Sequence, residues 1–207
     1  MKNNNFEKSI PPGHVIAKHL DAKNVKLGLL LNVIAILIFV CIAVLALIPV
    51  FKSNGKFDFF SDIGQLVKIM LYFSVFLILI LFYMILHELT HGAFYKVLTG
   101  EPLTFGISWS CAFCGVPNIY VYRKSALLAA AAPLVIFTAI LLPLTAFLYF
   151  INTTAYILSA FLFGMHLGGC AGDIYVVFLL LFKYKNNKTL IRDTGPEQFF
   201  YIPENPD

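Results

Sequence analysis

The chain has 207 residues, of which 59% are hydrophobic and only 13% are charged. A soluble domain of this size would have too few polar side chains to cover its surface, so the composition excludes an ordinary soluble fold and indicates a bilayer. The net charge of +4 does not indicate nucleic-acid binding, because lysines and arginines lie at the ends of apolar runs rather than in a stripe.

Four long apolar runs follow one another along the chain, at residues 27–51, 69–98, 125–151 and 155–182. Each exceeds the roughly 20 residues that a helix needs to cross about 30 Å of hydrocarbon. None shows the alternation of a barrel strand, so the backbone groups must be satisfied within helices. The sequence therefore predicts an all-α integral membrane protein with four transmembrane helices. Pro133 and Pro143 predict kinks in the third helix.

These spans divide the chain into a juxtamembrane segment (1–26), a four-helix membrane domain (27–182) and a polar tail (183–207). If the N-terminus is cytoplasmic, twelve lysines and arginines fall inside and three fall outside, which are Lys52, Lys56 and Lys68. Cytoplasmic flanks of membrane helices are enriched in Lys and Arg. We therefore expect a multi-pass protein of the cell membrane with both termini in the cytoplasm.

The segment between the second and third runs, residues 101–123, has a different pattern. Apolar residues alternate with smaller or polar ones from Leu103 to Phe113, and residues 119–122 are β-formers. We interpret the segment as a short β-hairpin that dips toward the membrane against the helices. A surface loop rich in apolar residues is the alternative.

The four cysteines do not form a clear framework. Cys41 and Cys170 lie inside apolar runs, where we expect them only to pack. Cys111 and Cys114 form a single CxxC in the predicted hairpin. A metal or redox pair would be the functional interpretation, but the chain has no second pair, so we favour two ordinary loop cysteines.

The second run contains His87-Glu88-Leu89-Thr90-His91. Residues four apart lie on one face of a helix, so both imidazoles can bind one Zn²⁺ while Glu88 serves as general base for the attacking water. A packed polar cluster is the alternative. Ionisable groups within a membrane cost roughly 2.5–3.5 kcal/mol each, so they usually serve a function. The motif therefore predicts a catalytic zinc site.

A catalytic zinc needs a third protein ligand, and the candidates are Asp173, His166 and Glu101. Eighteen residues of its span precede His87 and eighteen precede Asp173, which puts both about 27 Å along their helices. One aspartate and one glutamate also neutralise Zn²⁺, as a low-dielectric site requires. His166 lies about 10 Å before Asp173 along the axis. We predict Asp173 as the ligand and a second-shell or gating role for His166.

At these residues the chain resembles a bacterial membrane family described as "putative zincin peptidase", first classed as a domain of unknown function. The resemblance rests on residues 87–92, the cysteine-containing hairpin, and residues 129–133, 168–174 and 192–196. The chain is also similar to the site-2 protease group, in which an aspartate from a later transmembrane helix completes an HExxH site. That resemblance implies His87, His91 and Asp173 as ligands and Glu88 as base. The chain departs from that group by lacking the Asn-Pro-Asp-Gly form of the second motif.

Together these features predict an intramembrane zinc metalloprotease that acts on a membrane protein or peptide in the lipid bilayer, with no nucleic-acid partner. We expect the loop with Trp109, Cys111, Cys114 and Asn118 to present an edge to an extended substrate. The alternative is a non-proteolytic metal-binding membrane protein or a regulatory pseudoprotease. Glu88 favours the enzyme, because a purely structural metal site has no need of that residue.

Overall fold

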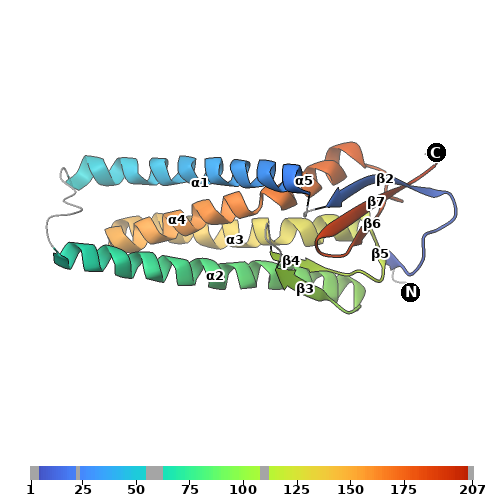
Figure 1. Cartoon of the computed structure of the whole chain (residues 1–207), viewed down its shortest axis with the longest axis horizontal. Helices are drawn as coiled ribbons and strands as arrows, with labels where there is room; N and C mark the ends of the chain where they lie inside the picture. Colours follow the sequence, from blue (N-terminus) through green and yellow to red (C-terminus); the bar gives the residue numbers. More distant parts are fainter. Residues whose placement is uncertain (1–4, 22–23, 55–62, 108–111, 205–207) are drawn as a thin grey trace. The chain divides into compact units, whose positions relative to one another are not determined.

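The computed structural model describes residues 5–21, 24–54, 63–107 and 112–204. The chain forms two compact units, whose helices and strands carry the labels of Figure 1. The first unit comprises Met1–Asn32, Leu86–Pro133 and Ala171–Asp207, and the second comprises Val33–Ile85 and Leu134–Cys170. The three long helices each contribute to both units, whereas the strands among the described residues all belong to the first.

The helical elements are α1 (Val25–Asn54), α2 (Ile63–Thr99), α3 (Arg123–Ile151), α4 (Thr153–Gly169), α5 (Ala171–Phe178) and the π-helical turn η1 (Leu179–Lys183). Among the described residues, α1, α2 and α3 are long and apolar enough to cross a membrane, which indicates a membrane protein. The fourth predicted helix is not one helix, because it is broken at Cys170 into α4 and α5. It reaches the length of a span only if both pieces are counted together.

The break in the fourth run has a local cause. Gly168, Gly169 and Gly172 surround Cys170, and glycine is among the poorest helix formers. Cys170 ends α4 with φ −75° and ψ 2°, and its N–H donates to the carbonyl oxygen of His166 at 3.0 Å. The chain then restarts as α5, so the prediction of four transmembrane helices is wrong for this run.

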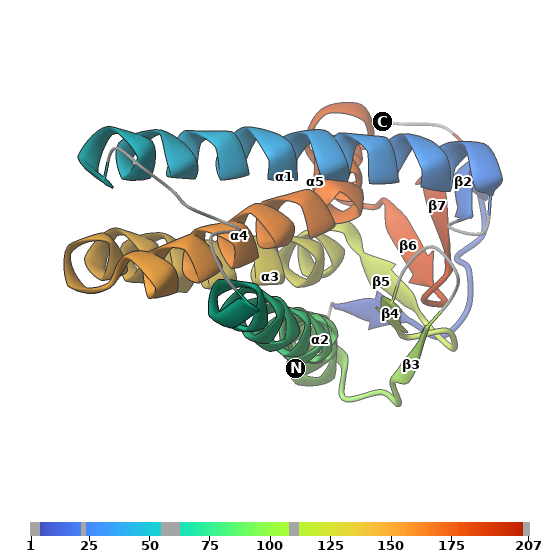
Figure 2. The same ribbon diagram turned by 60° about the vertical axis from the view of Figure 1, so that its left-hand side comes forward.

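The prediction of an all-α protein is also wrong, because the first unit contains a five-stranded antiparallel sheet (Figure 2). The strands in spatial order are β1 (Phe6–Glu7), β5 (Tyr120–Tyr122), β6 (Leu190–Asp193), β7 (Glu197–Pro203) and β2 (His14–Asp21). The longest pairing joins β2 to β7, with His14 opposite Pro203 and Asp21 opposite Glu197. Both strands lie in the terminal segments, where neither is long or apolar enough alone to predict a sheet.

The larger sheet joins segments that the helices separate along the chain. Strand β2 precedes α1, β5 lies between α2 and α3, and β7 follows the last helical segment. Strand β6 joins β5 to β7, and β7 pairs with β2, so segments from both ends and the middle of the chain belong to one hydrogen-bonded sheet.

Strands β3 (Thr104–Ile107) and β4 (Ala112–Gly115) form a separate antiparallel pair, where the sequence predicted a hairpin. Thr104 lies opposite Gly115, and Ile107 lies opposite Ala112. The β-formers that follow do not extend this hairpin, because they enter the larger sheet as β5.

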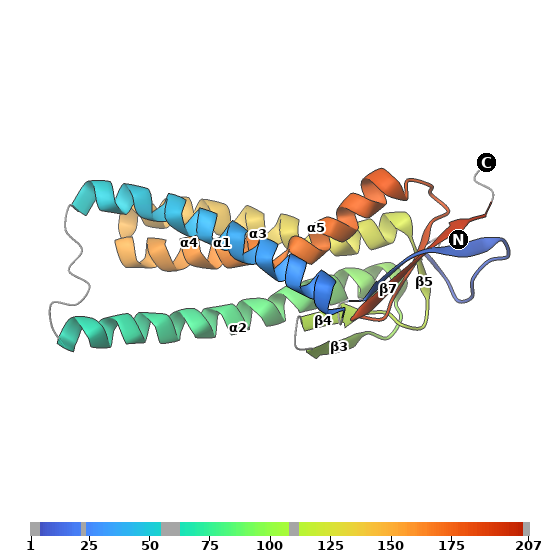
Figure 3. The ribbon, with the colours of Figure 1, turned by 45° about the horizontal axis from the view of Figure 1, so that its top comes forward.

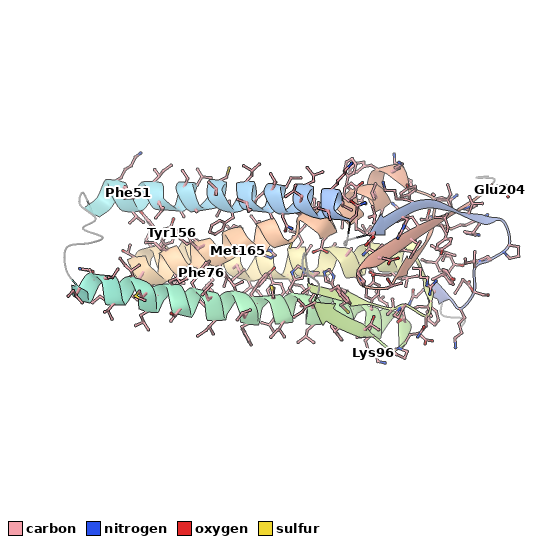
Figure 4. The ribbon with its side chains drawn as sticks, viewed as in Figure 1. Phe51, Phe76, Lys96, Tyr156, Met165 and Glu204 are labelled. Atoms are coloured by element: carbon pink, nitrogen blue, oxygen red, sulfur yellow. The ribbon has the colours of Figure 1, made fainter. Side chains whose placement is uncertain are left out.

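Helix α2 ends where its sequence provides the stop signals. Gly100 has φ +73°, a conformation that costs glycine little, and Pro102 follows two residues later. Lys96, labelled in Figure 4, lies in the last turn. Its ammonium donates to the carbonyl oxygen of Gly100 at 2.8 Å. The histidine motif therefore lies in the last four turns of a 37-residue helix.

In the first unit the sheet lies beside the helix segments that carry the polar motifs (Figure 3), and a hydrophobic core joins them. Its buried side chains include Phe200 and Ile191 of the sheet, Tyr95 of α2, Ala129 of α3 and Val176 of α5. Burial of apolar area stabilises by roughly 25 cal/mol per Å². This core therefore holds three helix segments at fixed positions relative to one another.

The second unit is an assembly of apolar helices with a small core of its own, formed by Ala46, Val50, Tyr156 and Ala160. Two of its helices approach closely at Gly168 of α4, where an added Cβ would lie 2.6 Å from the carbonyl oxygen of Ala35 in α1. Glycine here permits close helix approach, as in many membrane helix pairs.

Candidate metal centre

The two histidines of the motif lie one turn apart on α2 and face the same side. Their ring centroids are 4.9 Å apart with an interplanar angle of 77°. Both residues are buried, with 8% of His87 and 9% of His91 exposed. Because the helix is unbroken here, the spacing of four residues is enough to bring the imidazoles together.

Asp173, in the first turn of α5, completes the cluster. Its Oδ2 lies 3.2 Å from Nε2 of His87, and its Oδ1 lies 3.3 Å from Nε2 of His91. One potential ligand atom from each residue lies within 4.8 Å of the others. The structure therefore brings together the three residues that the sequence predicts as ligands.

The geometry fits a tetrahedral zinc ion. Two ligand atoms that are each about 2.0–2.1 Å from a tetrahedral ion lie roughly 3.3 Å from each other. In the described part of the chain, the buried Oδ2 of Asp173 receives no hydrogen bond. A bound cation would satisfy that oxygen. Two imidazoles and one carboxylate are also a donor set that zinc enzymes use.

The break at Cys170 is what positions Asp173. Helix α5 begins at Ala171, so Asp173 lies in its first turn, where the helix dipole favours a negative charge. Val176, one turn later, is buried in the core of the first unit. The packed side of α5 thus fixes the position from which the carboxylate reaches the histidines.

The other ring nitrogen of His91 is held by a group that sequence reasoning missed. Nδ1 of His91 lies 2.8 Å from the carbonyl oxygen of Ala129 in α3. This carbonyl would normally accept from the N–H of residue 133, but that residue is Pro133, which has none. A donated Nδ1–H leaves Nε2 as the metal-binding atom and sets the ring plane. The sequence signal for this contact was a proline four residues after Ala129.

His166 lies in the second unit and has hydroxyl partners there. It is fully buried, its Nδ1 lies 2.7 Å from the Tyr83 hydroxyl, and its Nε2 lies 2.9 Å from the Thr138 hydroxyl. The thiol of Cys170 lies 3.6 Å from Nδ1. Both ring nitrogens thus have hydroxyl partners, an arrangement that holds helices together.

The third candidate, Glu101, lies beyond the end of α2. Its carboxylate oxygen is 3.8 Å from Nζ of Lys8, so it takes part in an ion pair in another part of the first unit. The structure does not bring Glu101 into the cluster of His87, His91 and Asp173.

The predicted substrate-presenting loop is only partly described, because Trp109 and Cys111 lie outside the described residues. Asn118 is exposed in the turn before β5. Cys114 is buried in β4, and burial together with the charges of Asp193 and Glu88 raises the pKa of its thiol to about 12. Because Cys111 lies outside the described residues, the interpretation of the CxxC as two ordinary loop cysteines stays a prediction.

A second buried acid is Asp193 in β6, which lies in the 192–196 segment of the family resemblance but received no role from the sequence. It is 3% exposed, and its carboxylate accepts a hydrogen bond of 2.8 Å from the hydroxyl of Tyr95. Burial raises the pKa of Asp193 to about 6. The sequence offered a signal for its partner Tyr95, which continues the four-residue interval of His87 and His91 along one face of α2.

Comparison with known proteins gives a family and no individual relative. No curated protein and no solved structure matches the chain. The family described as "Putative zincin peptidase" matches residues 80–188, a region that contains the histidine motif, the hairpin and Asp173. The name of this family implies zinc as the metal and peptide hydrolysis as the reaction. Because the match covers more than half of the 207 residues, the chain belongs to the family of putative zincin peptidases.

Proposed function

We propose that this membrane protein is a zinc metallopeptidase that hydrolyses peptide bonds of membrane-associated substrates. The observation that carries the proposal is the approach of Asp173 to both histidines of the HExxH motif, at 3.2 and 3.3 Å. Two helices far apart in the sequence supply three zinc-type donors, beside a glutamate that a structural site would not need.

In this proposal His87, His91 and Asp173 hold the metal, and the Ala129 carbonyl keeps His91 in the binding tautomer. The bound zinc supplies a Lewis acid for the scissile carbonyl. Glu88 accepts the proton of the attacking water and then gives it to the leaving amine. Glu88 follows His87 directly and is half-buried, so it lies at the edge of the metal-binding face.

The substrate class follows from the surroundings of the site. A helical peptide bond is shielded by its own hydrogen bonds, so a substrate segment must be extended when it is cut. Among the described strands, β3 pairs with β4 alone, and most of its residues are exposed. Its other edge is therefore suited to pair with an extended substrate, as in other cases of strand addition.

We further propose that both termini are cytoplasmic and that cleavage occurs toward the cytoplasmic end of the substrate's membrane segment. Sheet pairing supports a common side for the terminal strands, and the charge distribution supports the cytoplasm as that side. Reporter domains fused after Asn54 and after Asp207 should report opposite sides of the membrane. Finding both on one side would contradict this topology.

The decisive test of the activity is Glu88→Gln, compared with wild type in zinc content and in cleavage of a panel of membrane peptides. We expect zinc content to be unchanged and turnover to fall at least about 100-fold, because a general base contributes roughly 10²–10⁴. Glu101→Gln is the matched control, since it makes the same change outside the metal cluster and should retain turnover.

Two outcomes would contradict the proposal. Wild type that binds zinc stoichiometrically but cleaves none of the peptides would favour the non-proteolytic alternative. Equal turnover in wild type and Glu88→Gln would exclude Glu88 as the base.

A further inference from the structure

Asp193 is a buried acid that the proposed chemistry does not use, and it lies beyond residue 188, where the family match ends. Its carboxylate receives three hydrogen bonds, from the Tyr95 hydroxyl at 2.8 Å, the Gly195 N–H at 2.9 Å and the Gln198 side-chain amide at 3.1 Å. A buried carboxylate is costly unless it is fully paired. The three donors indicate that this part of the fold is organised around the carboxylate of Asp193.

The first of these donors connects Asp193 to the helix of the metal centre. Tyr95 lies one turn beyond His91 on α2 and is only 4% exposed. The spacing of four residues puts it on the same face as His87 and His91. Asp193 is thus bonded to the face of α2 that carries two of the proposed metal ligands.

The backbone around Asp193 holds the hairpin strand β4. The carbonyl oxygen of Asp193 accepts from the N–H of Val116, the residue after β4, at 2.8 Å. A Cβ added at Gly115 would collide with the backbone nitrogen of Gly195 and would lie 2.7 Å from the carbonyl carbon of Thr194. Strand β4 therefore ends in direct backbone contact with the turn that follows Asp193.

The same hairpin also contacts α2 directly, through its other strand. A Cβ added at Gly92 would lie 2.8 Å from the ring of Phe105 and 3.1 Å from the side chain of Leu103. Gly92 follows His91 directly, so Phe105 of β3 packs beside the metal-binding turn. The hairpin is thus held on α2 through β3 and on the Asp193 turn through β4.

We propose that Tyr95 and Asp193 are a positioning pair that holds the β3–β4 hairpin in register with the metal-binding face of α2. The hydrogen bond between them closes a ring of contacts that runs from α2 to β3, β4, the Asp193 turn and back to α2. The purpose of the pair, to place the edge of β3 for an extended substrate, rests on the proposed peptidase function. In this proposal the C-terminal strand β6, which carries Asp193, helps to position the substrate-binding edge of β3.

The test compares two variants, each of which removes one hydrogen bond from a tyrosine hydroxyl to a carboxylate. Tyr95→Phe removes the bond to Asp193, and Tyr122→Phe removes a bond of the same length, 2.8 Å, from Tyr122 to Glu7 at the edge of the sheet. Amide hydrogen exchange is measured on the full chain with zinc and without substrate. We expect the amides of residues 103–116 to exchange about tenfold faster in Tyr95→Phe only, equivalent to about 1.4 kcal/mol.

Zinc content and peptide kinetics complete the test. Zinc content should stay at the wild-type value in both variants, because neither tyrosine is a proposed ligand. With a peptide that wild type cleaves, Tyr95→Phe should raise KM about tenfold with little change in kcat, and Tyr122→Phe should change neither. Asp193→Asn serves as a second variant if Tyr95→Phe folds poorly. It keeps the shape of the side chain, and the buried Oε1 of Gln198, which has no hydrogen-bond partner among the described residues, can accept from the new amide.

Unchanged exchange in residues 103–116 would overturn the pair as a positioning device, as would the same acceleration in Tyr122→Phe. Faster exchange with unchanged KM would overturn the substrate-placing purpose and leave a structural contact. Because exchange is measured without substrate, these results are distinguishable from failure of the proposed peptidase, which only the comparison of wild type with Glu88→Gln decides.

Discussion

In the described part of the chain, buried histidines lie in both units, and the histidine cluster of the first unit differs from that of the second in its hydrogen-bond and ion-pair partners. In the first unit, the Nε2 atoms of His87 and His91 face the carboxylate of Asp173. In the second unit, the two ring nitrogens of His166 face the hydroxyls of Tyr83 and Thr138. Both clusters lie on helices that are apolar over most of their length.

The difference shows that a buried histidine is not by itself a ligand. A hydroxyl can donate to one ring nitrogen and accept from the other, so a neutral imidazole between two hydroxyls is fully satisfied. A carboxylate can only accept, and Oδ2 of Asp173 receives no hydrogen bond among the described residues. The first cluster therefore has a negative oxygen that a cation would satisfy, whereas the second already has its partners.

The largest expected difference between the clusters is in zinc affinity. Asp173→Ala removes the only carboxylate of the metal cluster, so we expect zinc to bind at least roughly 100-fold more weakly. His166→Ala should leave zinc affinity nearly unchanged and instead lower thermal stability, because it leaves a cavity and removes hydrogen bonds to two hydroxyls. Competition with a zinc chelator measures the affinity. Wild-type affinity in Asp173→Ala would show that another residue is the third ligand.

A smaller effect is expected from the close helix contact near His166. Gly168→Ala would put a methyl group 2.6 Å from the Ala35 carbonyl oxygen, whereas nothing lies within 4 Å of the same position at Gly169. We expect Gly168→Ala to lower the free energy of unfolding by about 1–3 kcal/mol, since the helices must separate. Gly169→Ala should be neutral or slightly stabilising. Unfolding in detergent compares the two, and equal stabilities would contradict the contact between α4 and α1.

The smallest expected effect concerns the carbonyl that orients His91. Pro133→Ala restores an N–H that competes for the Ala129 carbonyl oxygen, so we expect zinc affinity to fall about tenfold, as for other groups that orient a ligand. Pro143→Ala is the matched control in the same helix. It restores a helix hydrogen bond at an exposed position of the second unit and should leave zinc affinity unchanged. Equal affinities in both variants would show that the Ala129 contact does not tune the site.

The proposed catalytic centre was largely predictable from the sequence. His87, Glu88 and His91 lie in one motif on one helix, so the 3.6-residue period alone places the two imidazoles together. Asp173 was predictable by depth and charge, because few acids occur in the apolar runs. The role of Ala129 was not predicted, since a backbone carbonyl has no side chain to mark it. The one sign in the sequence was Pro133, which lacks the N–H that would normally bond this carbonyl.

The sheet was not predicted, and the reason is the distance along the chain between its strands. His14 pairs with Pro203, and Val121 pairs with both Phe6 and Ile191, so no local pattern contains a complete pair. A strand of two to eight residues is stable only once its partners are present. The terminal segments therefore appeared to be a polar lead-in and tail.

By itself the sequence determined what depends on local periodicity, which is the long apolar helices, the facing histidines and the hairpin between α2 and α3. The tertiary structure decided what depends on contacts between distant segments. It broke the fourth run at Cys170 and joined both ends of the chain in one sheet. It also brought Asp193 to Tyr95, a hydrogen bond between residues 98 positions apart. The physical reason is that a helix satisfies its backbone within a few residues, whereas a strand or a buried carboxylate must find its partners elsewhere in the chain.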